Sequence, residues 1–393
     1  MKVLVLSCNT GEGHNTAGRA IIENMRKKGF QADMINALEL MGVRRSKLVC
    51  GVYIKMVKKI PALFGFFYNL SLLISTHRFK SIIYYANKPS QKKLYDYIVK
   101  NGYDTIVLPH LFPAETITSI RLNHEFTNFK CYAIATDYTC IPFWEDLEMD
   151  GIVIGHRMQT QELLDRRMDP ALIAPLGIPV SEKFSKDYDK DAMRRELGLE
   201  SCGIVYLIMT GSMGFGNIKA MLKPLLEACE PDDRVVVLGG RNEKLKRTLR
   251  KNFGSHGNLS VVDYTNEVEK YMAAADVLIT KPGGLSTSEA ATMGIPIVHT
   301  KPIPGVESRN AIFFSELGMS VYEKKPANVA AAAVRLAHDE DAKREMIRRQ
   351  HENINRSATN DICDYIIASA SGSVKSTNEP RCAQRGGERT AAN

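Results

Sequence analysis

The 393-residue chain lacks the long apolar run that a membrane-spanning helix requires. No stretch of about 18 uncharged apolar residues occurs, so the sequence predicts no spanning helix. The eight cysteines are scattered, without a C-x-x-C pair or a histidine spacing typical of zinc sites. We therefore expect reduced thiols, a cytoplasmic location and no bound metal. The apolar residues at 2–7 form too short a run for a signal peptide and predict a first strand.

Two familiar nucleotide-binding fingerprints are also missing. The first glycine-rich turn, 7–15, has neither the G-x-G-x-x-G spacing of dinucleotide-binding folds nor the Lys-Ser/Thr pair of a P-loop. No acidic residue ends a second strand at the interval that NAD binding uses, since Asp33 lies inside its strand. The sequence therefore argues against a dehydrogenase.

Acidic residues are absent from one long segment, between Glu39 and Asp96. This segment accounts for the net positive charge of the chain, because the net charge is +8 and the rest of the chain has 8 − 11 = −3. Its eleven cations are Arg44, Arg45, Lys47, Lys55, Lys58, Lys59, Arg78, Lys80, Lys88, Lys92 and Lys93. Apolar and aromatic runs at 63–68 and 70–74 are interleaved with these cations. Such a mixture suits a surface on an anionic bilayer, where each cation contributes about 1 kcal/mol.

Two other interpretations of the basic segment are a core helix flanked by solvated lysines and a nucleic-acid-binding surface. The long apolar cluster favours a membrane over nucleic acid. We therefore expect residues 43–93 to contact an anionic membrane surface, and we expect no nucleic-acid partner.

Strand and helix signals alternate along both halves of the chain. Apolar runs predict strands at 2–7, 32–36, 105–109, 131–135, 151–154, 171–175, 203–209, 234–238, 259–262, 276–280 and 295–299. This alternation predicts an α/β protein with two doubly wound parallel sheets. The expected parts are a domain at 1–176, a linker at 177–190, a second domain at 191–345, helices at 346–370 that brace the first domain, and a disordered tail at 371–393.

The most informative turn, 281–289, joins the apolar run 276–280 to a helical segment. Its small residues are Gly283, Gly284, Ser286 and Thr287. Free backbone N–H groups and the positive end of a helix dipole collect at such a turn and suit a phosphate. Glu289 lies one turn further on, within reach of a neighbouring sugar hydroxyl. An ordinary turn with a serine cap is the alternative.

Two further turns of the second half could serve the same ligand. The turn at 210–217 has three glycines and includes Ser212 and Gly214, so its backbone can approach phosphate oxygens closely. The segment 301–310 would direct Glu307 and Asn310 toward the cleft that Glu289 faces. A proline-rich surface loop followed by a solvated helix face is the alternative for this segment.

In the first half, Gly13 and His14 lie in the first strand-to-helix turn. Imidazole is the natural general base near neutral pH, although a capping or solvent-facing histidine would also fit this position. Asp137 follows the predicted strand 131–135. It is either an acceptor-side or catalytic carboxylate facing a cleft, or a turn-forming aspartate.

Taken together, these motifs resemble the monogalactosyldiacylglycerol synthase and processive diacylglycerol glucosyltransferase family. The segments that carry the resemblance occur in the family's order, at 11–14, 136–138, 177–179, 281–289 and 304–310. The resemblance spans about residues 1–370 and is strongest over 276–310.

This resemblance implies a GT-B fold, with two Rossmann-like domains around a deep cleft. It implies a UDP-sugar substrate, UDP-glucose or UDP-galactose, and no tightly bound cofactor. The donor residues that it implies are Gly13, the phosphate-side Ser212, Gly214, Gly283, Gly284, Ser286 and Thr287, the ribose-binding Glu289, and the hexose-side Glu307 and Asn310. In the first domain, it makes His14 the base and Asp137 an acceptor-side acid.

We therefore expect an inverting transferase that moves a hexose from a UDP-sugar to diacylglycerol on the inner face of the cell membrane. One alternative keeps the fold and changes the acceptor to another lipid, such as an undecaprenyl-linked precursor. The other is a non-catalytic, nucleotide-regulated membrane-binding protein, which would not need His14.

Overall fold

The computed structural model describes residues 1–8, 12–41, 88–123, 127–211 and 218–372, with isolated residues at 65, 70–71, 75, 81 and 84. Most of the predicted membrane segment, 43–93, lies outside these residues, as do Ser212, Gly214 and the predicted tail from residue 373 onward.

The N-terminal domain is built on a parallel sheet of six strands in the order β2-β1-β3-β4-β5-β6. Its strands are β1 (Lys2–Ser7), β2 (Gln31–Asn36), β3 (Thr105–Leu108), β4 (Lys130–Ile134), β5 (Gly151–Val153) and β6 (Ile173–Ala174). The helices in this part of the sequence are α1 (Glu12–Lys27), α5 (Lys88–Lys100), α6 (Leu111–Asn123) and α7 (Gln159–Asp165). Short 3-10 turns are η1 (Ala37–Met41), η2 (Trp144–Asp146), η3 (Pro170–Leu172) and η4 (Glu182–Ser185).

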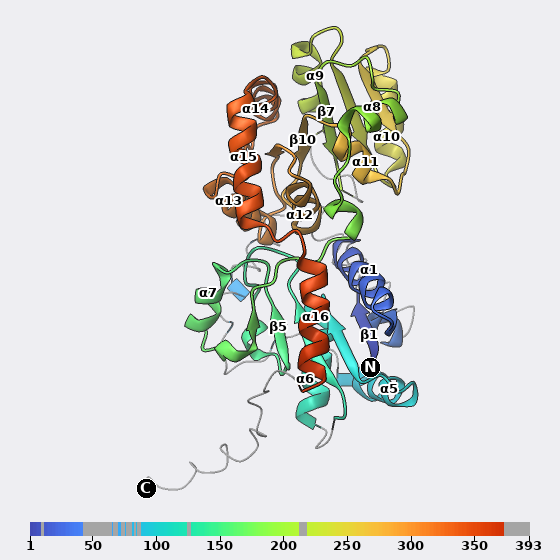
Figure 1. The fold of residues 1–393 in the computed structure, drawn as a ribbon, viewed down its shortest axis with the longest axis vertical. Coiled ribbons are helices and arrows are strands. Elements are labelled where there is room, and N and C mark those ends of the chain that lie inside the picture. The colour runs from blue at the N-terminus through green and yellow to red at the C-terminus, as the bar shows by residue number, and fades with distance from the viewer. Residues whose placement is uncertain are drawn as a thin grey trace.

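The C-terminal domain has a second six-stranded parallel sheet, in the order β12-β11-β10-β7-β8-β9. Its strands are β7 (Val205–Met209), β8 (Arg234–Leu238), β9 (Leu259–Val262), β10 (Val277–Thr280), β11 (Ile297–His299) and β12 (Val321–Tyr322). The later helices are α8 (Lys190–Glu196), α9 (Ile218–Ala228), α10 (Glu243–Phe253), α11 (Val268–Ala274), α12 (Gly284–Met293), α13 (Val306–Glu316), α14 (Pro326–His338), α15 (Glu340–Asn353) and α16 (Ala358–Ala370). Figure 1 shows the two domains stacked along the long axis of the molecule.

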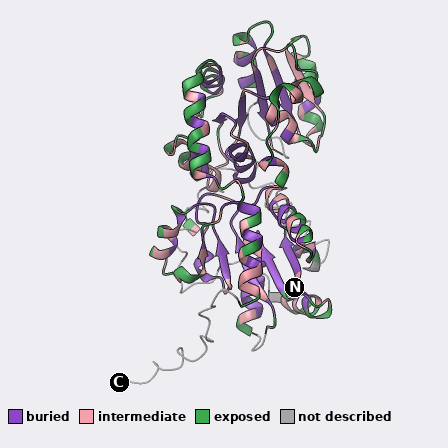
Figure 2. Ribbon diagram, viewed as in Figure 1, coloured by how far each residue is buried: buried purple, intermediate pink, exposed green. Residues whose placement is uncertain are grey.

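Burial on both faces explains the continuous apolar runs of the strands. Side chains alternate across a strand, and in β1 both sets are buried. Val3 and Val5 pack in one cluster with helices α1 and α16, whereas Leu4 and Leu6 pack in another with α5 and α6. A strand covered by helices on both faces is apolar throughout, and Figure 2 shows the buried strands between more exposed helices.

The last helix, α16, lies on the N-terminal sheet although it follows the C-terminal domain in sequence (Figure 1). Ile362, Cys363 and Ile366 are fully buried in the cluster that holds Val3 and Val5. The chain therefore passes between the domains twice, once after β6 and once before α16.

The predicted α/β architecture of two parallel, doubly wound sheets is confirmed. One predicted strand, 171–175, is largely replaced by the 3-10 turn η3, which leaves only the two residues of β6. The cause is local, because the Asp169 side chain accepts a hydrogen bond from the Ala171 N–H at 2.9 Å and caps a turn that begins with Pro170.

Candidate functional site

The candidate site lies where the ends of N-terminal strands meet the first turns of α12 and α13. A Cβ atom added at Gly284 would lie 1.9 Å from the Thr136 carbonyl oxygen, so only glycine permits this approach. A Cβ atom at Gly13 would lie 3.6 Å from the Leu285 side chain. The two domains are thus in direct contact at the turn that sequence analysis assigned to phosphate.

His14 lies in the first turn of α1 and is half-buried. Its Nδ1 atom is 2.8 Å from the Pro109 carbonyl oxygen and 3.1 Å from Thr136 Oγ1. Burial lowers the pKa of His14 from its ordinary value, against a smaller opposing effect of the hydrogen bond with Pro109. Burial therefore favours the neutral form of His14.

A second histidine, His110, packs against the first, with ring centroids 4.4 Å apart in an edge-to-face arrangement. Its Nδ1 atom accepts a hydrogen bond from the Phe112 N–H at 3.0 Å, at the start of α6. Burial lowers the pKa of His110 well below its ordinary value, and His14 lowers it further. Sequence analysis missed His110, although its position just after β3 was a usable signal.

Asp137 follows the end of β4 and faces α13 of the other domain. Its Oδ1 atom accepts a hydrogen bond from Asn310 Nδ2 at 2.7 Å. Asn310 is fully buried, donates to the Pro282 carbonyl oxygen at 3.1 Å and accepts from the Tyr138 N–H at 2.9 Å. Burial raises the pKa of Asp137 to about 6, while the hydrogen bond from Asn310 opposes that rise.

Lys281, Ser286 and Glu307 surround Gly283, the N-cap residue of α12. A Cβ atom at Gly283 would lie 3.4 Å from Lys281 Nζ, 3.6 Å from Ser286 Oγ and 3.8 Å from Glu307 Oε1. Lys281 forms an ion pair with Glu307, which also accepts the Ile303 N–H at 2.9 Å. Sequence analysis overlooked Lys281, a cation at the very start of the predicted anion-binding turn.

No side chain of the described residues caps α12 at Gly283. The first N–H groups of a helix have no partner within the helix, and the helix dipole makes this end positive. Together with the Lys281 ammonium group, the first turn of α12 offers a suitable environment for an anion.

Glu289 lies on α12, and only 8% of its surface is exposed. Its carboxylate has no hydrogen-bond partner among the described residues, and Lys183 and Glu269 act on it electrostatically. Burial raises the pKa of Glu289 to about 8, while Lys183 lowers it and Glu269 raises it further. A buried acceptor without a protein partner is suited to a ligand that brings its own donors.

The Thr287 side chain has an internal role. It is fully buried, and its hydroxyl lies 3.2 Å from Nε2 of His299, whose Nδ1 lies 3.0 Å from Ser320 Oγ. The structure thus brings together Gly13, His14, Asp137 and Asn310 with the first turn of α12, and turns the Thr287 hydroxyl away from that surface. The positions of Ser212 and Gly214 lie outside the described residues.

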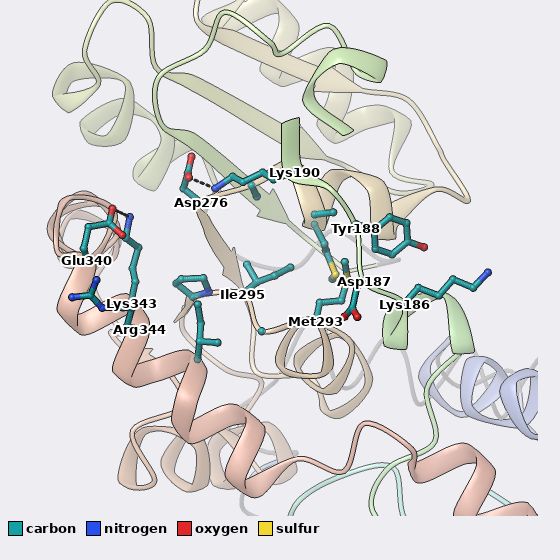
Figure 3. A pocket seen from close by; sticks show the side chains of 16 residues that line it. Lys186, Asp187, Tyr188, Lys190, Asp276, Met293, Ile295, Glu340, Lys343 and Arg344 are labelled. Atoms are coloured by element: carbon teal, nitrogen blue, oxygen red, sulfur yellow. Dashed lines mark hydrogen bonds and ion pairs between the residues drawn. The ribbon is translucent and has the colours of Figure 1, made fainter. Parts of the chain in front are cut away.

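A separate pocket lies at the other end of α12 (Figure 3). Its lining residues come from the segments 186–190, 272–276, 293–296 and 340–347, and none of them belongs to the predicted site. Its charged groups include two internal ion pairs, Lys190 with Asp276 and Lys343 with Glu340. Internally paired charges indicate no particular ligand, so we assign no function to this pocket.

Within the described ranges, no helix is long and apolar enough to cross a membrane. In the same residues, no group of three or more His, Cys, Asp or Glu side chains is placed to hold a metal ion. In the part of the chain that the structure describes, the candidate site combines two histidines, carboxylates, a lysine and helix-terminal N–H groups.

Two family models match the chain, one for each domain. Residues 14–180 match monogalactosyldiacylglycerol (MGDG) synthase, and residues 214–353 match glycosyl transferases group 1. The first match begins at His14 and includes Asp137, whereas the second includes the turn before α12 and the start of α13.

Curated relatives cover nearly the whole chain. A processive diacylglycerol beta-glucosyltransferase of Bacillus pumilus is 25% identical over 344 residues, which are 86% of this chain and 88% of the relative. The enzyme of the same name from Bacillus subtilis is 26% identical over 361 residues, 90% of each chain.

Solved structures share the fold at low sequence identity. MurG of Acinetobacter baumannii superposes with a TM-score of 0.61 at 15% identity, covering 93% of this chain and 99% of that one. The Staphylococcus aureus MnaA–UDP structure gives a TM-score of 0.63 at 12% identity, covering 94% and 97%. The chain thus has the GT-B fold. Residues 14–180 are similar to the monogalactosyldiacylglycerol synthase family and residues 214–353 to glycosyl transferases group 1, and these similarities confirm the resemblance seen in the sequence motifs.

Proposed function

We propose that this protein transfers a hexose from a UDP-sugar, UDP-glucose or UDP-galactose, to diacylglycerol with inversion at the anomeric carbon. One observation carries the proposal. His14, the first residue of the MGDG synthase match, is fixed by Pro109 and Thr136 beside the N-terminus of α12, where a sugar diphosphate would bind. The nearly full-length similarity to processive diacylglycerol beta-glucosyltransferases supports the choice of acceptor.

The donor would bind mainly to the C-terminal domain. The N–H groups of the first turn of α12 and the Lys281 ammonium would stabilise the negative charge that develops on the departing UDP. Glu289 would accept hydrogen bonds from the ribose hydroxyls, and Glu307 and Asn310 would contact the hexose. Because Thr136 lies against Gly284 in the structure, the domains would part to admit the diphosphate and close again around it.

The acceptor would be activated by His14. The Pro109 carbonyl oxygen accepts a hydrogen bond only if Nδ1 carries the proton, so the lone pair is on Nε2. Nε2 would take the proton of the diacylglycerol hydroxyl as that oxygen attacks the anomeric carbon. Attack from the face opposite to UDP would invert this centre and give a β-glycoside.

The acceptor's location predicts a place for the protein at a membrane surface. Diacylglycerol resides in a bilayer, and residues 43–93 combine cations with apolar and aromatic side chains. We propose that this segment lies on the anionic inner face of the cell membrane as a peripheral contact.

The test is mass spectrometry of lipids after incubation of the full-length protein with diacylglycerol vesicles and a mixture of UDP-sugars. We expect a monohexosyl product from one UDP-hexose, and none from a His14→Ala variant over the same time. Release of UDP without any glycosylated lipid would refute the acceptor assignment, and absence of both would refute the transferase activity.

A further inference from the structure

The Thr136 side chain lies between two residues of the candidate site, His14 and Asp137. Its hydroxyl oxygen is 3.1 Å from His14 Nδ1 and 3.4 Å from Asp137 Oδ2. Thr136 is 7% exposed and follows the end of β4. One hydroxyl group thus connects the Asp137 carboxylate to the His14 imidazole, and the structure shows no direct hydrogen bond between these two groups.

The carbonyl group of Pro109 fixes the direction of these hydrogen bonds. A carbonyl oxygen is only an acceptor, so at 2.8 Å it requires a proton on His14 Nδ1. The N–H group is then shared between the Pro109 oxygen and Thr136 Oγ1. The Thr136 hydroxyl proton remains available for Asp137 Oδ2, which completes a chain in which every donor has an acceptor.

Asp137, at the end of this series of hydrogen bonds, is held by a residue of the other domain. Asn310 Nδ2 donates to Asp137 Oδ1 at 2.7 Å, and Asn310 itself is held by the Tyr138 N–H and the Pro282 carbonyl. The carboxylate of Asp137 is therefore oriented by α13 only when the two domains are in contact.

We propose that Thr136 is a positioning residue that couples the Asp137 carboxylate to His14, and that domain closure completes this coupling through Asn310. The proposal rests on the proposed function in one respect, because it takes His14 as the base. It adds the residue Thr136 and the condition that His14 is fully activated only when the two domains are in contact.

Only one proton moves in this step. His14 Nε2 takes the proton of the acceptor hydroxyl, and the ring becomes positively charged. His14 Nδ1 and the Thr136 hydroxyl keep their protons. The two hydrogen bonds link the new positive charge on His14 to the negative charge of Asp137. A carboxylate near an imidazolium stabilises the charged form, so the coupling makes His14 a stronger base.

Three other titratable groups lie near these hydrogen bonds. His110 packs on the His14 ring from the start of α6. Glu307 raises the pKa of Asp137 and Lys281 lowers it, both from the C-terminal domain. None of these three groups is changed by a substitution at Thr136, so a substitution there isolates the hydroxyl.

The test compares Thr136→Val, which removes the hydroxyl at constant shape, with Thr136→Ser, which keeps it. Thr116→Val is the matched control, because Thr116 is also buried and its hydroxyl donates to a backbone carbonyl in α6 at 3.1 Å. The first measurement is the titration of the His14 ring by NMR in the full-length protein, without substrates. The second is the pH profile of kcat/KM for transfer to diacylglycerol.

We expect Thr136→Val to lower the pKa of the His14 ring by about half a unit, and Thr136→Ser and Thr116→Val to leave it unchanged. In the pH profile, the acidic limb should move to lower pH and the plateau of kcat should fall about 10-fold, with KM for the UDP-sugar retained. An unchanged His14 titration in Thr136→Val would overturn the coupling. That result is independent of activity, so it is distinguishable from failure of the proposed function, in which the wild-type protein makes no glycolipid.

Discussion

Replacing Glu289 by glutamine should stabilise the protein at neutral and alkaline pH while weakening its binding of UDP. Glu289 is 8% exposed and has no hydrogen-bond partner among the described residues, and burial raises its pKa from 4.5 to about 8. Holding its negative charge therefore costs free energy in the folded state. Glutamine has nearly the same shape and no charge.

The size of the effect follows from the two pKa values. An acid whose pKa is higher in the folded state binds its proton more tightly there, so stability falls as pH rises from 4.5 toward 8. The cost is about 1 kcal/mol at pH 5, about 3 kcal/mol at pH 7 and about 5 kcal/mol at pH 9. The glutamine variant avoids this cost, so its advantage should grow with pH and level off above pH 8.

Urea unfolding at pH 5, 7 and 9 measures this advantage, with Glu269→Gln as a control. Glu269 forms an ion pair with Lys183 at 2.6 Å. Replacing the Glu269 carboxylate by a neutral amide should therefore bring no comparable gain in the free energy of unfolding. Calorimetric titration with UDP at pH 9, where Glu289 is ionised, should show Glu289→Gln binding at least about 10-fold more weakly, because hydrogen bonds to a charged carboxylate are stronger than those to a neutral amide oxygen. A stability difference that does not change with pH would refute the reasoning.

Three further substitutions test other parts of the structure. His14→Ala should keep its affinity for UDP and lose at least about 100-fold in turnover, measured by UDP release; near-normal turnover would remove His14 from its role. Gly284→Ala should lower the free energy of unfolding by about 1–3 kcal/mol, because its methyl group would meet the Thr136 carbonyl, whereas Gly257→Ala, with no atom within 4 Å, should not. Ile362→Ala should cost about 2–5 kcal/mol in urea unfolding, and a change below 1 kcal/mol would contradict the packing of α16.

The strands were the most predictable part of the fold. Residues 2–7, 234–238 and 259–262 form strands with the bounds expected from their apolar runs. A parallel strand covered on both faces must be apolar throughout, and this signal is local in sequence. Helix α6 gives no such signal, because residues 113–120 are all buried, which removes the alternation of apolar and polar faces that identifies a helix.

Part of the composition of the candidate site was also predictable, but His110, Lys281 and the connections between the residues were not. Glycines and hydroxyl residues before a helix point to an anion, and a histidine at a turn points to a base. The bond between Asn310 and Asp137 joins residues 173 positions apart, and it exists only because the two domains dock. Buried networks of this kind depend on tertiary geometry, which no spacing rule encodes.

The position of α16 has a consequence for synthesis on the ribosome. Ile362 and Ile366 complete a core that begins with Val3 and Val5, so the N-terminal domain cannot finish folding until almost the entire chain has been translated. The C-terminal domain, whose strands and helices lie between residues 190 and 353, can fold first. At about 5–20 residues per second, the first sheet would wait many seconds with one face uncovered, a period in which chaperones would have access to it.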